Sequence, residues 1–168
     1  MEVQDTHSRV SFASISGKSV EATFDGGTLT SDSGALLLRA VESQVGVVDQ
    51  LPQALTDRRH PRYVVHPLAD LLKQRVFQIA CGYEDANDCN DLRTDPGFKA
   101  ACDRWPISGK DLASQPTMSR LENGVRRREL YRMAYALADV FIASYNQPPS
   151  YQVRDIDDTE DEVHGHQP

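Results

Sequence analysis

The chain has 168 residues and a formal net charge of −7, and 39% of its residues are hydrophobic. It has no apolar run near the roughly 18 residues of a membrane span and no apolar export signal, so we expect a cytoplasmic protein without a membrane partner. Residues 57–128 carry 13 Lys or Arg against 10 Asp or Glu, so the acidic overall charge does not exclude binding to nucleic acid.

Residues 1–30 contain two runs of alternating apolar and polar residues, 8–15 and 19–24, separated by a short Ser-Gly-Lys segment. This pattern predicts a small N-terminal β-hairpin. Residues 30–33 then offer N-caps for a helix over residues 34–44, whose apolar side chains recur on one face: Leu36, Leu37, Ala40 and Val41. The polar connection at residues 57–62 holds three arginines and is the first candidate surface for phosphate.

Residues 31–147 are predicted to form a helical domain. Pro67 begins an amphipathic helix that ends at Gly82, and shorter helical pieces follow at residues 85–93 and 97–104. The longest predicted helix covers residues 129–145. Its apolar side chains recur at helical spacing, which indicates a packed face and not a cofactor site. These side chains are Leu130, Met133, Ala134, Leu137, Val140 and Phe141. The three cysteines match no zinc-binding spacing and receive no role.

A short helix is predicted from Pro116 to Gly124, with Met118 and Leu121 pointing inward and with Ser119 and Arg120 exposed. A recognition helix needs such a polar first turn, because it must reach phosphates or base edges. We therefore assign DNA contacts to the following residues: Thr117, Ser119, Arg120, Arg126, Arg127 and Arg128. The alternative is an ordinary connecting helix with a solvated face, and the residues alone favour that alternative.

The last segment, residues 148–168, is predicted to be a linker followed by a β-strand over residues 151–157. Six of the eight residues from Asp155 to Glu162 are acidic. This much like charge is stable only when it is solvated or neutralised by a cation, and a divalent metal is the natural partner of carboxylates.

Several sequence blocks occur in a recognisable order: Gly34 to Leu38, His66 to Val76, Gly82 to Asp88, Leu112 to Asn123 and Asp155 to Asp161. In this order they resemble the N-terminal part of a DDE-domain transposase of bacterial insertion sequences. The resemblance implies a helical region that binds double-stranded DNA at the element ends, followed by an RNase-H-like domain that cleaves and transfers strands. It leaves open whether the chain forms a homo-oligomer.

In that family two Asp and one Glu hold two divalent ions, Mg²⁺ or Mn²⁺. The family's Asp-x-Thr pattern falls on Asp157-Asp158-Thr159, so the resemblance assigns Asp157 as the first catalytic and metal-binding acid, with Asp155 and Asp158 as alternatives. Two metals need ligands from several strands, so we expect this chain alone to be inactive and not to bind the ion tightly.

The expected fold class is therefore mainly α, with a small hairpin, a helical domain and the first strand of an incomplete RNase-H-like α/β domain. Two other functions remain as alternatives. The Asp-x-Asp-x-Thr pattern from Asp155 to Thr159 also matches haloacid-dehalogenase-like phosphatases, although that signature normally opens its domain. The chain could instead be a non-catalytic fragment that binds DNA and regulates transposition.

Overall fold

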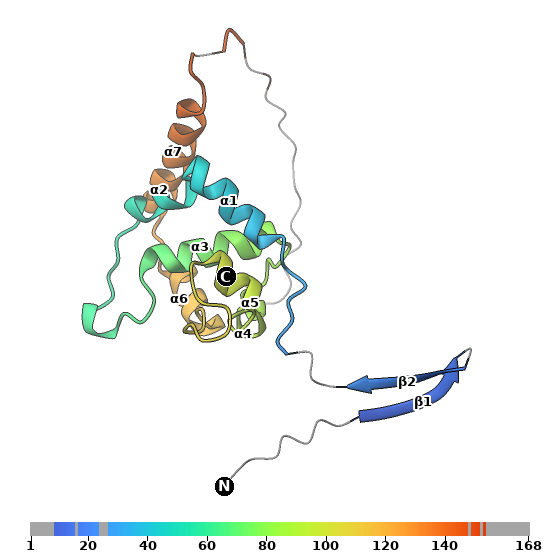
Figure 1. The fold of residues 1–168 in the computed structure, drawn as a ribbon. Helices are drawn as coiled ribbons and strands as arrows, with labels where there is room; N and C mark the ends of the chain where they lie inside the picture. The colour runs from blue at the N-terminus through green and yellow to red at the C-terminus, as the bar shows by residue number, and fades with distance from the viewer. Residues whose placement is uncertain (1–8, 16, 24–26, 148, 152, 154–168) are drawn as a thin grey trace, which may run out of the picture.

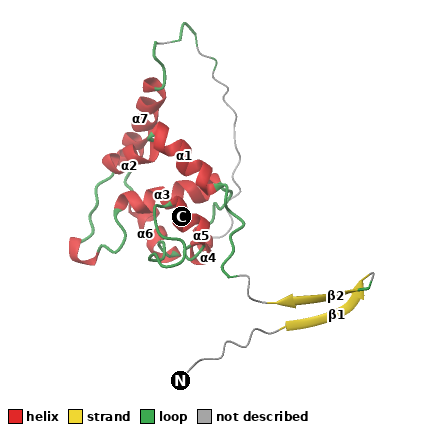
Figure 2. Cartoon of the chain, viewed as in Figure 1, coloured by secondary structure: helices red, strands yellow, loops and turns green. Residues whose placement is uncertain are grey.

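The computed structural model describes residues 9–15, 17–23, 27–147, 149–151 and 153. The described part is mainly helical, with a single two-stranded sheet (Figures 1 and 2). Its strands and helices, in chain order, are β1 Arg9–Ile15, β2 Lys18–Thr23, α1 Ala35–Val45, α2 Val47–Ala54, η1 Pro61–Tyr63, α3 Leu68–Ala80, η2 Ala86–Asp88, α4 Cys89–Leu92, α5 Pro96–Ala101, α6 Gln115–Gly124 and α7 Arg127–Ala143.

The predicted hairpin is confirmed. Strands β1 and β2 pair antiparallel, with Arg9 opposite Thr23 and Phe12 opposite Val20. Gly17 between the strands has a φ of 78°, a left-handed conformation that glycine adopts without steric cost. Figure 1 shows that the hairpin lies apart from the helices.

The helices begin and end at the residues that local chemistry favours. Pro67 immediately precedes α3, as predicted within one residue, and Gly82 follows its end with a φ of 91°. Asp95 caps α5, because its carboxylate accepts a hydrogen bond of 2.8 Å from the backbone N–H of Phe98. Helix α1 is preceded by Gly34 without a side-chain cap, so the N-caps predicted at residues 30–33 do not form.

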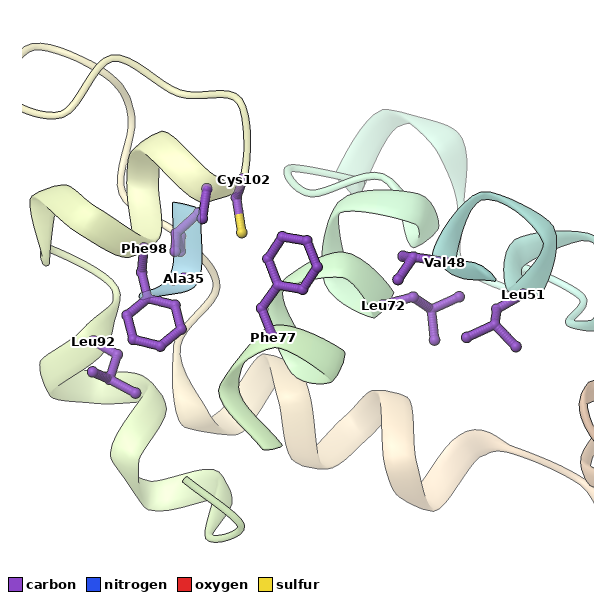
Figure 3. Packing of buried hydrophobic residues seen from close by; sticks show 10 residues of the cluster. Ala35, Val48, Leu51, Leu72, Phe77, Leu92, Phe98 and Cys102 are labelled. Carbon is purple, nitrogen blue, oxygen red and sulfur yellow. The ribbon is translucent and has the colours of Figure 1, made fainter. Parts of the chain in front are cut away.

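The main core lies between α1, α2, α3, α4 and α5. Figure 3 shows Phe77 of α3 at its centre, with Phe98 and Cys102 on one side and Val48 and Leu51 of α2 on the other. Phe98 is fully buried and Phe77 is 2% exposed. Helix α3 packs against α2 and α6, whereas α1 packs on α5 and α7 packs on α2.

Two predicted apolar faces differ from the structure. In α1 the side chains of Leu36, Leu37 and Val41 are exposed, because α1 packs on α5 through the side that carries Ala35. In α7 only part of the predicted apolar face is buried. Val140 is buried, whereas Leu130, Leu137 and Phe141 are 55%, 47% and 45% exposed. Helical periodicity identifies an apolar face, but it does not show that another element covers it.

The strand predicted over residues 151–157 is not seen in its described residues. Tyr151 and Val153 belong to no strand, and both side chains are exposed. The other residues of that segment lie outside the described part of the chain.

Gln74 makes a testable contribution to stability. Its side-chain amide is 1% exposed and bonds both backbone groups of Ala113, with distances of 2.9 Å to the carbonyl oxygen and 2.8 Å from the N–H. Gln74→Leu keeps the volume but leaves two buried polar groups without this partner, so we expect a loss of about 2–4 kcal/mol in urea unfolding.

The matched control is Gln53→Leu, because Gln53 is an exposed glutamine on α2. Its effect should stay within about 0.5 kcal/mol. Equal stability of the two variants would show that the Gln74 bonds do not hold the Ala113 segment in place.

Candidate nucleic-acid interface

Helix α6 is anchored by buried contacts at its start. Met118 is fully buried and packs with Leu71, Cys89 and Ala113. Just before the helix, the Gln74 amide holds Ala113, and Asn90 accepts a hydrogen bond of 3.1 Å from the backbone N–H of Gln115. Toward the other end, the Glu122 carboxylate pairs with Arg75 of α3. Helix α6 therefore presents its polar face from a fixed position.

The polar face of α6 matches the prediction in part. Arg120 is exposed, and its guanidinium lies 3.5 Å from the half-buried hydroxyl of Thr117. Ser119 was expected to be exposed, but it is half-buried and its hydroxyl accepts a hydrogen bond of 3.0 Å from Gln115. Ser119 therefore supports the helix surface, whereas Arg120 is exposed on it.

A buried carboxylate joins the start of α7 to the connection after α2. Glu129 is 1% exposed, and its oxygens accept hydrogen bonds from the backbone N–H groups of Thr56 and Arg126, each at 2.9 Å. The Arg58 guanidinium donates to both oxygens, at 2.9 and 3.2 Å. The hydrogen bonds from Arg58, together with those from the two backbone groups, lower the pKa of Glu129 to about 2.

The three consecutive arginines lie where α7 begins. Arg126, Arg127 and Arg128 are all exposed. Arg127 lies over the Tyr131 ring, with its guanidinium carbon 5.8 Å from the ring centre. The ion pairs formed between described residues include neither these three arginines nor Arg120. Four guanidinium groups on α6 and α7 thus face solvent without a described carboxylate partner.

The arginines in the basic connection at residues 57–62 are less available for contacts with phosphate than the sequence indicates. Arg58 is bound to Glu129, and Arg59 forms a two-pronged pair with Asp57, at 2.8 and 2.6 Å. The hydrogen bond from Arg59 lowers the pKa of Asp57, so this carboxylate stays charged near neutral pH. Arg62 is exposed on the short helix η1.

A cavity of about 270 Å³ lies beside Arg58, Arg59 and Arg120. Its apolar walls come from the connection after α2 and from helices α3 and α6, and its lining also includes Arg58, Arg59, Thr117 and Arg120. The cavity therefore brings two predicted DNA-contact residues, Thr117 and Arg120, next to two arginines of the basic connection. The lining also includes the partners of these two arginines, Glu129 and Asp57, so Arg120 is the lining arginine without a described carboxylate partner that could meet a phosphate or the face of a base.

A family model described as transposase DDE domain group 1 matches residues 12–168. The chain belongs to this family. No curated protein and no solved structure matches the chain. Membership connects the chain with DNA transposition and therefore with a DNA substrate.

DDE transposases normally use a divalent metal. The described residues contain no group of three or more His, Cys, Asp or Glu side chains that could hold such an ion. The predicted ligands Asp155 and Asp157 lie outside the described residues.

Burial raises the pKa of the Cys102 thiol to about 12, which makes it a packing residue and not a nucleophile. None of the helices in the described ranges is long and apolar enough to cross a membrane.

In this transposase-family chain, the buried pair of Glu129 and Arg58 was not predicted from the sequence. The available signal was an acid in the first turn of a helix that otherwise begins with arginines, because a carboxylate at this position satisfies free backbone N–H groups. The partner could not be found by spacing, since Arg58 lies 71 residues away in the chain.

Proposed function

We propose that this DDE transposase-family chain binds duplex DNA at insertion-sequence ends through α6 and the start of α7. The supporting observation is the group of four exposed guanidinium groups, Arg120 and Arg126 to Arg128, for which no described carboxylate forms an ion pair. The acid nearest to Arg126, Arg127 and Arg128 in sequence, Glu129, is buried and bound to Arg58, so it offers little repulsion to phosphate. The acid nearest to Arg120, Glu122, is paired with Arg75.

Within this surface the arginines have different roles. Arg126, Arg127 and Arg128 neutralise phosphates, which contributes affinity without sequence preference. Arg120 projects from a helix that is anchored at Ala113 and Met118, and a fixed helix can place a guanidinium against a base edge reproducibly. Thr117 and Ser119 orient the helix surface, since both hydroxyls already bond within α6.

Arg120→Ala tests the specific contact. We expect it to reduce the preference for element-end DNA over unrelated duplex by about 1–3 kcal/mol, because one bidentate base contact contributes about that much discrimination. Competition titrations with the two duplexes measure the preference. The matched control is Arg39→Ala, because Arg39 is exposed on α1 and paired with Asp103. An unchanged preference in Arg120→Ala would assign base reading to other residues.

The acids of the last segment are proposed to serve the metal-dependent chemistry of the family. Asp157 is the proposed first ligand for Mg²⁺ or Mn²⁺, with Asp155 as the alternative. The bound ions supply charge stabilisation for an in-line displacement at phosphorus. A non-catalytic role that consists of DNA binding alone uses the same surface on α6 and α7, and the phosphatase hypothesis gains no support from the family match.

A further inference from the structure

Helix α7 has an apolar surface that is wider than the part covered by α2. The side of α7 that carries Val140 packs along α2. On the rest of the helix and just after it, seven large apolar or aromatic side chains are each at least 43% exposed: Leu130, Tyr131, Tyr135, Leu137, Phe141, Ile142 and Tyr145. Figure 1 shows that α7 extends beyond the other helices at its C-terminal end, so a second helix has room to approach.

The centre of this exposed surface has a regular spacing. Tyr131, Ala134, Ala138 and Phe141 follow one another at intervals of three, four and three residues, which is the spacing of a coiled-coil seam. Ala134 and Ala138 are exposed as well. Two small residues in the middle allow a close approach of helix axes, and the aromatic rings at both ends supply contact area.

We propose that α7 pairs with α7 of a second copy of this chain in an antiparallel, two-fold symmetric arrangement. With the two-fold axis midway between Ala134 and Ala138, each Ala134 lies opposite Ala138 of the second copy. Tyr131 then lies opposite Phe141 of the second copy. Leu130 and Leu137 line one edge of the seam, and Tyr135 and Ile142 line the other. Large residues meet large residues and small residues meet small ones, so the surface is self-complementary.

Charge selects the antiparallel direction. A parallel pair would bring the exposed Arg126, Arg127 and Arg128 of both copies to the same end, where like charges repel. The antiparallel pair separates the two arginine groups by the length of α7, about 25 Å for 17 residues. The antiparallel pair also places the positive end of each helix dipole beside the negative end of the other. The exposed surface is of the size that a dimer needs, since seven side chains of roughly 200 Å² each, about half exposed, present at most about 700 Å² per copy, close to the roughly 800 Å² per partner of a standard interface.

Sedimentation velocity over a wide range of concentrations tests the pairing. We expect the chain to form a dimer whose fraction rises with concentration and Ala138→Glu to remain a monomer, because it places two carboxylates in the seam. Ala69→Glu is the matched control, since Ala69 is an exposed alanine on α3, and this variant should still dimerise. Circular dichroism checks that both variants are folded. A monomeric parent chain at every concentration, or an undiminished dimer of Ala138→Glu, would overturn the proposal.

Cysteine cross-linking tests the direction of the helices. In a Cys81→Ser background, which leaves the buried Cys89 and Cys102 in place, Ala134→Cys mixed with Ala138→Cys should cross-link much faster than either variant alone. A disulfide needs Cα atoms within about 7 Å, and among the cysteine pairs compared only residue 134 with residue 138 of the other copy comes that close in the antiparallel arrangement. Faster cross-linking of like with like would contradict the antiparallel arrangement.

Discussion

Replacing Glu129 with alanine is expected to destabilise the chain more than the Gln74→Leu substitution does. The Glu129 carboxylate is 1% exposed and accepts hydrogen bonds from Arg58, Thr56 and Arg126. Its removal leaves the Arg58 guanidinium and two backbone N–H groups without their acceptor, and such groups are costly when they lose their partner. Urea unfolding measures the loss.

The control for Glu129 is Glu122→Gln, because the Glu122 side chain is 40% exposed whereas that of Glu129 is 2% exposed. It should cost less than about 1 kcal/mol, because solvent screens a pair whose carboxylate is exposed. Similar losses in the two variants would show that the Glu129 network does not tie α7 to the connection after α2.

The pKa of Glu129 gives a second test of the same network. The pKa is lowered from 4.5 to about 2, so the charged form is favoured in the folded state. The stability from this shift is fully present above pH 4.5 and is lost as the pH falls through about 2. The difference in Tm between the parent chain and Glu129→Gln should therefore shrink over this range. A difference independent of pH would contradict the assignment.

Replacing Arg126, Arg127 and Arg128 together with alanine is expected to weaken DNA binding on every sequence. If each arginine neutralises one phosphate, the plot of log affinity against log salt should become shallower by about one unit per lost contact, or about three units in total. The same change should not destabilise the helix, because basic residues at a helix N-terminus are unfavourable with respect to the dipole. Binding titrations at several salt concentrations, with circular dichroism as the folding check, separate the two effects.

The control for the triple substitution is Arg39→Ala, Lys73→Ala and Lys110→Ala together, which also removes three positive charges. Arg39 and Lys73 both pair with Asp103 in the structure, and Lys110 is exposed elsewhere in the helical region. An equal loss of affinity in the control would mean that net charge, and not the surface at the start of α7, governs binding.

The sequence predicted those parts of the fold that depend on local signals. Pro67 and Gly82 bracket α3, and Met118 points inward from α6, because proline, glycine and a single apolar periodicity act within a few residues. The coverage of apolar faces depends on distant elements. Leu37 of α1 is therefore exposed at 71% although its pattern resembles that of a packed helix.

The candidate site was predictable to a similar extent. Arg120 and the three arginines at the start of α7 could be identified as an exposed basic group from residue type and spacing. The buried pair of Glu129 and Arg58 could not, since it joins segments far apart in the chain. Ser119 was misplaced because its hydroxyl bonds with Gln115, one helical turn away, and side-chain pairs of this kind withdraw polar groups from solvent.

The most direct test of the account is a fluorescence anisotropy titration of the full chain with a labelled insertion-sequence end at two salt concentrations. We expect saturable binding at low salt that weakens strongly at high salt, because phosphate contacts dominate the affinity. Absence of binding at low salt would contradict the proposal that α6 and the start of α7 form a DNA-binding surface.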